Sequence, residues 1–83
     1  MPPQLSRITR LTLRWIEAPD YETDIAASNE LTSYLEDSGN TQEQIDYWFS
    51  YSSNMMALEG ETLASIIETE AILARMQGTL LAG

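Results

Sequence analysis

The feature that most constrains this chain is the run RITRLTLRWI over residues 7–16, in which apolar and polar side chains alternate. Side chains of a β-strand point alternately to its two faces, so Leu11, Leu13 and Trp15 would share one face. Threonine, isoleucine and tryptophan suit a pleated, half-buried surface, and such alternation is typical of a half-buried strand. The sequence therefore predicts a β-strand or extended arm over residues 6–16, after an extended lead-in over residues 1–5.

A single strand needs partners for its backbone N–H and C=O groups, and no second strand-like run follows it. Three arrangements satisfy this need. The strand pairs with its copy in a second subunit, adds to a sheet edge of a different protein, or lies across helices of its own chain. We favour the first arrangement, which predicts a homodimer.

The rest of the chain is predicted to be helical. Pro19 and Asp20 end the strand, and Asp20 is a suitable N-cap for a helix over residues 21–37. Its inner face is predicted to carry Tyr21, Ile25, Ser28, Leu31 and Leu35. Gly39 is a natural residue to follow the end of this helix. The chain is thus mainly α, or α+β at most.

A second helix is predicted over residues 41–59, because Thr41 and Gln44 have the spacing of a capping box. A third is predicted over residues 61–78. The apolar spacing continues through Gly60, so one long helix is an alternative, at a cost of about 1 kcal/mol for the internal glycine. All of these elements fit one small domain over residues 1–83, with two or three helices after the strand.

The composition suggests that a partner completes the core. Hydrophobic residues make up 43% of the 83 residues, and cysteine and histidine are both absent, so neither disulfides nor structural zinc can stabilise the chain. The net charge is −9, from 13 acidic residues against four arginines. This charge opposes binding of the whole chain to nucleic acid or to an anionic membrane. The expected location is the cytoplasm, that of the host if the chain is viral, because no secretory signal or membrane span is apparent.

Few residues offer catalytic chemistry. Without histidine, cysteine or lysine the usual bases, nucleophiles and phosphate-binding groups are missing, and no glycine-rich phosphate loop is present. The carboxylate pairs Glu59/Glu61 and Glu68/Glu70 are two residues apart, so on a helix they point in different directions. We therefore expect no enzyme activity, no cofactor and no metal.

The densest aromatic cluster surrounds Trp48. On a helix Trp48 and Phe49 would face the core, with Trp48 buried, while Tyr47 and Tyr51 would lie together on the flank. The cluster is either core with a packed flank or an anchor for a partner, since tyrosine and tryptophan dominate binding hot spots. Two nearby methionines are either gap-filling core or an adaptable docking surface. The candidate partner-binding residues are Tyr47, Tyr51, Met55 and Met56.

The predicted strand, a helix, the turn Gly39-Asn40-Thr41 and a second helix together resemble the ribbon-helix-helix family over about residues 9–56. In that family two chains pair their strands into a ribbon that enters the major groove of DNA. The resemblance implies phosphate contact by the backbone near Thr41 and an antitoxin-like regulator that binds DNA and a toxin. It implies base contacts by Arg10, Thr12 and Arg14.

These observations lead to one main prediction and two alternatives. The main prediction is a small acidic non-catalytic protein that binds another protein, as a regulator, an inhibitor or an assembly component, with a phage or mobile element as a fitting origin. The first alternative is the ribbon-helix-helix regulator or antitoxin. The second is a nucleic-acid mimic that inhibits a nucleic-acid-binding enzyme.

Overall fold

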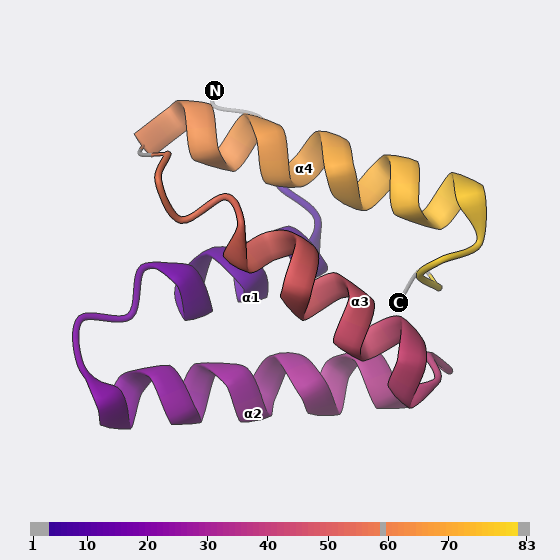
Figure 1. Cartoon of the computed structure of the whole chain (residues 1–83), viewed down its shortest axis with the longest axis horizontal. Coiled ribbons are helices and arrows are strands. Elements are labelled where there is room, and N and C mark those ends of the chain that lie inside the picture. Colours follow the sequence, from indigo (N-terminus) through magenta and orange to yellow (C-terminus); the bar gives the residue numbers. More distant parts are fainter. Residues whose placement is uncertain (1–3, 59, 82–83) are drawn as a thin grey trace.

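The computed structural model describes residues 4–58 and 60–81, and within them the chain forms four helices and no strand. Figure 1 shows α2 along one side, α4 along the opposite side, α1 between them and α3 crossing in front. The prediction of a mainly α fold is confirmed. The helices are α1 (Arg7–Ile16), α2 (Tyr21–Asp37), α3 (Gln42–Ser53) and α4 (Gly60–Gln77).

The predicted strand over residues 6–16 is wrong, because this segment is helix α1. Its sequence also fits a helical period, since Ile8, Leu11 and Trp15 recur at intervals of three and four. Ser6 caps the helix by accepting a hydrogen bond from the backbone N–H of Thr9. A helix satisfies its own backbone groups, so the strand-pairing argument for a homodimer no longer applies.

Helix α2 begins and ends where the sequence predicts. The carboxylate of Asp20 accepts from the N–H of Thr23 at 2.8 Å and caps its start. Its predicted inner face is correct only in the second half, where Leu31 and Leu35 are buried, whereas Tyr21 is 78% exposed. Figure 1 explains the difference, because the first turns of α2 extend past the end of α3.

The predicted turn after α2 is confirmed at Gly39. This residue has φ +90°, and its N–H donates to Glu36 O while the next N–H, of Asn40, donates to Leu35 O. These two bonds form a Schellman motif, which satisfies the last carbonyls of a helix. The same pair of bonds recurs after α4, around Gly78.

Two separate helices follow, so the single long helix through Gly60 is not formed. The capping box between Thr41 and Gln44 is present at the start of α3. Helix α3 ends at Ser53, before the predicted residue 59, which lies outside the described residues. Gly60 adopts φ +63° where α4 begins, a left-handed conformation that glycine tolerates.

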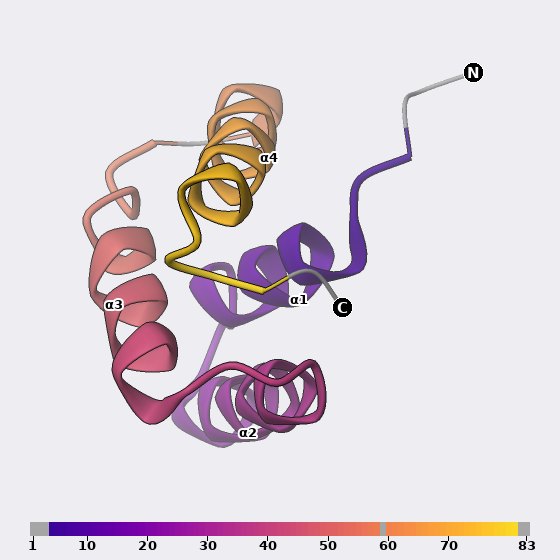
Figure 2. The same cartoon turned by 90° about the vertical axis from the view of Figure 1, so that its right-hand side faces the viewer.

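The segment after α4 returns to the core. Leu80 is buried, and the Asn40 side chain joins this segment to the end of α2, accepting from Leu81 N at 2.6 Å and donating to Leu35 O at 3.0 Å. The third helix is predicted to end at residue 78, and sequence patterns predict no role for the segment that follows it. Figure 2 shows it passing between α4 and the helices below.

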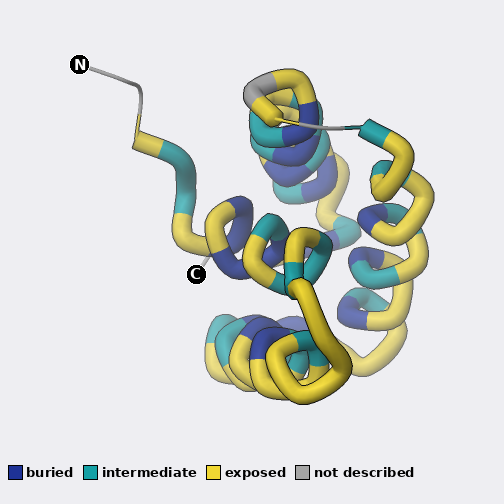
Figure 3. Tube along the Cα trace, turned by 90° about the vertical axis from the view of Figure 1, so that its left-hand side faces the viewer, coloured by how far each residue is buried: buried dark blue, intermediate teal, exposed yellow. Residues whose placement is uncertain are grey.

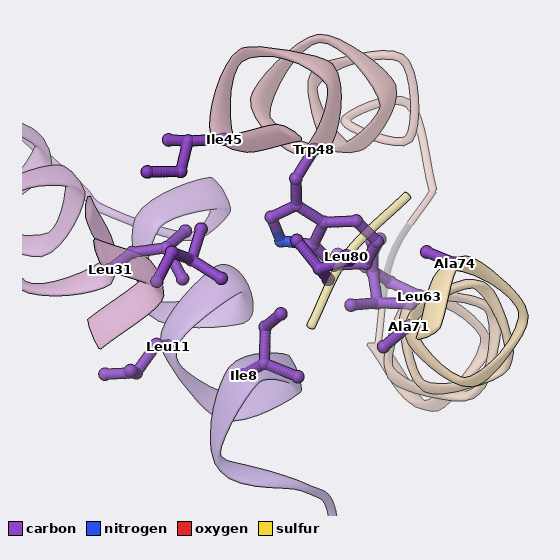
Figure 4. Close-up of a cluster of buried hydrophobic side chains, with 11 residues drawn as sticks. Ile8, Leu11, Leu31, Ile45, Trp48, Leu63, Ala71, Ala74 and Leu80 are labelled. Carbon is purple, nitrogen blue, oxygen red and sulfur yellow. The ribbon is translucent and has the colours of Figure 1, made fainter. Parts of the chain in front are cut away.

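The core lies where the four inward helix faces meet (Figure 3). Trp48 is 1% exposed, which confirms its predicted burial. Figure 4 shows its ring between Ile8 of α1 and Leu63 and Ala71 of α4. Its indole N–H donates to the Thr12 hydroxyl at 2.9 Å, and Thr12 in turn donates to Ile8 O at 2.7 Å.

Candidate functional site: a groove between α3 and α4

A groove of about 310 Å³ separates the outer faces of α3 and α4. Its position follows from the packing, because α3 and α4 diverge from the loop that joins them (Figure 1), while α1 lies behind α3 and below α4 (Figure 2) and contacts both. Its lining combines aromatic and aliphatic side chains with one carboxylate and one amide. The lining residues are Tyr47, Trp48 and Tyr51 from α3 and Glu70, Leu73, Ala74 and Gln77 from α4.

The α3 side of the groove is an aromatic pair. Tyr47 and Tyr51 are one helical turn apart, and their ring centroids are 5.9 Å apart with 34° between the ring planes. Trp48 lies between them in sequence and directs its ring into the core, so the tyrosines rest on a fixed base. Tyr47 is 44% exposed. The pair therefore presents aromatic surface to solvent on a rigid support.

The α4 side carries a carboxylate. Hydrogen bonding with the Glu70 carboxylate raises the pKa of the Tyr51 hydroxyl, and the burial of the phenol and the negative charges nearby act in the same direction. Glu70 and Tyr51 are thus neighbours across the groove. In the part of the chain that the structure describes, Arg14–Glu30 is the only ion pair, so Glu70 has no arginine partner there.

A second, shallower hollow of about 230 Å³ continues from the first. Both are lined by Tyr47, and the second is bounded by Glu43 and Gln44 of α3 and by Gly78 and Thr79 after α4. The amide of Gln44 donates to Gly78 O at 3.2 Å and bridges the two sides at this end. The α3–α4 surface is therefore hollowed along more than one turn of each helix.

The structure brings together two of the four predicted partner-binding residues. Tyr47 and Tyr51 line the groove, as their i, i+4 spacing allows. Met55 is packed against the core and Met56 is 51% exposed, and neither lines the groove.

Sequence reasoning missed the α4 half of the groove. Glu70, Leu73 and Gln77 have the i, i+3, i+7 spacing of one helix face. That spacing was visible, but only the fold places this face opposite the tyrosines.

The residues implied by the ribbon-helix-helix resemblance do not share a surface. Arg10 and Arg14 are exposed on α1, and Arg14 pairs with Glu30 of α2 at 2.9 Å. Thr12 is buried on the opposite side of the helix, against Trp48. A ribbon requires a strand, and the described part of the chain has none.

The carboxylates of Glu68 and Glu70 point in different directions, as two-residue spacing predicts. Glu68 faces the N-terminus of α1, where it accepts from Ser6 Oγ at 2.9 Å and from the Thr9 hydroxyl, while Glu70 faces the groove. Glu59 and the side chain of Glu61 lie outside what the structure describes. Within residues 4–58 and 60–81, no three acidic side chains are placed to hold a metal ion.

None of the described helices combines the length and the apolar character needed to cross a membrane. Comparisons of the chain with protein-family models, with curated protein sequences and with solved structures gave no match.

Proposed function

We propose that this chain is a small non-catalytic protein that works by binding a segment of another protein in the groove between α3 and α4. The observation that carries this proposal is the pair of Tyr47, which is exposed, and Tyr51, which is half-buried, along a groove of about 310 Å³. Tyrosines supply large contact area with few rotatable bonds, which makes them frequent anchors of protein interfaces.

The surroundings of the groove support this proposal over catalysis. The lining contributes two phenols, one carboxylate and one amide as its polar groups, besides the buried indole N–H, which is already bonded to Thr12. The Tyr51 hydroxyl lies beside the Glu70 carboxylate, but its raised pKa leaves less of it in the nucleophilic phenolate form. Concave apolar surface with a few convergent polar groups is the usual form of a binding site.

Selection from a random peptide library displayed on phage tests this proposal. We expect recovered peptides to bind the native chain and to lose most of their affinity for the Tyr51→Leu variant, which keeps apolar volume but removes the ring. Truncating a central interface tyrosine costs about 2 kcal/mol or more, equivalent to a loss of about thirtyfold. Fluorescence anisotropy with labelled peptides measures this affinity.

Tyr21→Leu is the matched control, because Tyr21 is an exposed tyrosine on α2, outside the groove. Peptides that bind the Tyr21 and Tyr51 variants equally well would place the binding surface elsewhere. Failure to recover any peptide that depends on Tyr51 would also contradict the proposal.

The homodimer remains a prediction, and one observation still favours it. Three apolar side chains of α4 lie at its surface, which is consistent with the apolar surplus seen in the sequence. They are Ile72, Leu73 and Met76. Of these, Leu73 also lines the groove, so self-association and partner binding compete for part of one surface.

A further inference from the structure

Building on the proposed function, we infer that the groove recognises a cationic side chain of the partner, with arginine as the best fit. The guanidinium lies against the rings of Tyr47 and Tyr51 and pairs with the Glu70 carboxylate. The ligand class is therefore a basic peptide segment, and the recognition groups are two aromatic faces and one negative charge on opposite sides of one groove.

The aromatic pair supplies the first half of this recognition. Cations are attracted to the face of a tyrosine ring, and arginine makes this contact more often than lysine because its planar group also stacks. The same contact exists elsewhere in this protein, where the Arg7 guanidinium lies 5.3 Å from the centre of the Tyr34 ring. Tyr47 and Tyr51 offer two such rings within reach of one guanidinium, since their centroids are 5.9 Å apart.

Glu70 supplies the second half. Glu68 and Arg75 are seven residues apart on one face of α4, and the positive charge of Arg75 acts on Glu68. Glu70 lies on the neighbouring face with Leu73 and Gln77, so Arg75 is directed away from it. Glu70 is half-buried in the groove, so its carboxylate is partly shielded from water and attracts an incoming cation more strongly than it would at an open surface.

The distribution of charge over the whole chain favours the same ligand. Three of the four arginines are on α1, while α3 carries Glu43 and Asp46 and no basic residue. In Figure 2, α3 lies at one edge of the molecule and α1 lies nearer the middle. The groove therefore lies on an acidic side of a protein of net charge −9, which attracts basic segments and accelerates their approach.

A separate protein fits the groove better than the basic helix of a second copy. On α1, Arg14 is paired with Glu30 and Arg7 is placed over Tyr34, so inserting that face would first break both contacts. Of the three arginines on α1, only Arg10 could enter the groove of another copy without breaking such a contact. The occupant we infer is thus a basic segment of a different chain.

The test uses small probes of defined charge. Nα-acetyl-arginine methylamide is titrated into the full ¹⁵N-labelled chain, and Nα-acetyl-citrulline methylamide, its neutral isostere, is titrated in parallel. We expect saturable shifts of backbone amides around Tyr51 and Gln77 with the arginine probe and no saturation with citrulline. Nα-acetyl-lysine methylamide should bind the same amides more weakly.

Matched variants assign the effect to single groups. Glu70→Gln should weaken the arginine probe about fivefold or more, and Glu36→Gln, which removes an exposed charge on α2, should leave its affinity nearly unchanged. Tyr51→Phe keeps the ring and should retain most of the affinity. Tyr51→Leu should lose it. Amide spectra of each variant also show that it is folded.

The outcomes separate this inference from the proposed function. Equal binding of arginine and citrulline, or arginine binding that survives Glu70→Gln and Tyr51→Leu, would overturn the cation site. Selected peptides that need Tyr51 but carry no basic residue would uphold the proposed function and overturn this inference. Sedimentation equilibrium tests the remaining occupant, a second copy of this chain. A dimer that forms in the native chain and is abolished by Glu70→Gln would show that a second copy fills the groove and would refute a separate partner.

Discussion

At the scale of single residues, the Thr12 hydroxyl has an unusual position for a threonine inside a helix. It accepts from the indole N–H of Trp48 and donates to Ile8 O, so one side chain links α1 to the centre of the core. A buried donor that loses its acceptor has neither a protein partner nor the water that bonds it in the unfolded chain, and this lowers the stability of the folded state. Thr12 is thus a structural residue rather than a contact for DNA.

We expect Thr12→Val to lower the free energy of unfolding by about 1–3 kcal/mol, because valine fills the space but leaves the Trp48 N–H unpaired. Urea denaturation followed by tryptophan fluorescence measures the change. Thr69→Val is the control, since Thr69 makes the same i−4 bond, to Ser65 O at 2.9 Å, on an exposed surface. It should change stability by less than about 0.5 kcal/mol. Equal effects of the two substitutions would contradict the role given to Thr12.

At the scale of elements, the sequence predicted the starts and ends of helices better than it predicted the type of the first element. Asp20, Thr41 and Gly39 each act through local bonds, and all three have the predicted roles. The apolar residues of the segment 7–16 fit both the period of two of a β-strand and the period of an α-helix. Its helical form is stabilised by contacts with α2, α3 and α4, which local patterns cannot include.

The two Schellman motifs allow a matched experiment. Gly39 and Gly78 both have positive φ, so alanine at either position should lower stability by about 1–2 kcal/mol through backbone strain. An added Cβ at Gly39 would also come within 3.2 Å of Leu81 Cδ1, whereas Gly78 has open space around it. Since Leu81 is an exposed side chain that can move, we expect the two losses to be similar. Thermal unfolding measured by circular dichroism tests this, and an unchanged melting temperature in either variant would contradict the strained backbone.

At the scale of the whole molecule, Glu68 connects α4 to the start of α1. Desolvation alone would raise the pKa of Glu68, but hydrogen bonds from Thr9 and Ser6 and the charge of Arg75 outweigh it and hold this pKa below its ordinary value of 4.5. The folded state therefore binds this proton more weakly than the unfolded state. The stabilisation is complete above the ordinary pKa and is lost as pH falls through the lowered one.

Accordingly, Glu68→Gln should reduce the urea midpoint at pH 7, and the difference from the native chain should shrink as the pH is lowered below about 4. Comparison of the two proteins cancels the titration of the other acids. Glu36→Gln serves as the control and should show a small difference with little dependence on pH. A difference for Glu68→Gln that does not change with pH would exclude the carboxylate as its cause.

The candidate site shows the limit of sequence reasoning at this scale. Tyr47 and Tyr51 were predicted because their spacing on one helix is a local property. The sequence indicates Glu70 only as one half of the pair Glu68/Glu70, because only the fold places α4 opposite α3 and turns that face toward the tyrosines. The groove is a product of two helices whose separation no local pattern encodes.

The bonds from Ser6 and Thr9 to Glu68 also have a consequence for the order of folding. They join positions 62 and 59 residues apart, almost the full length of the described chain. Contacts so distant in sequence form late, since the whole intervening chain must first be closed into a loop. During synthesis α1 can meet α2 early, yet the Ser6 and Thr9 hydroxyls cannot bond the Glu68 carboxylate until α4 has been made. The earliest helix is therefore among the last to be completed.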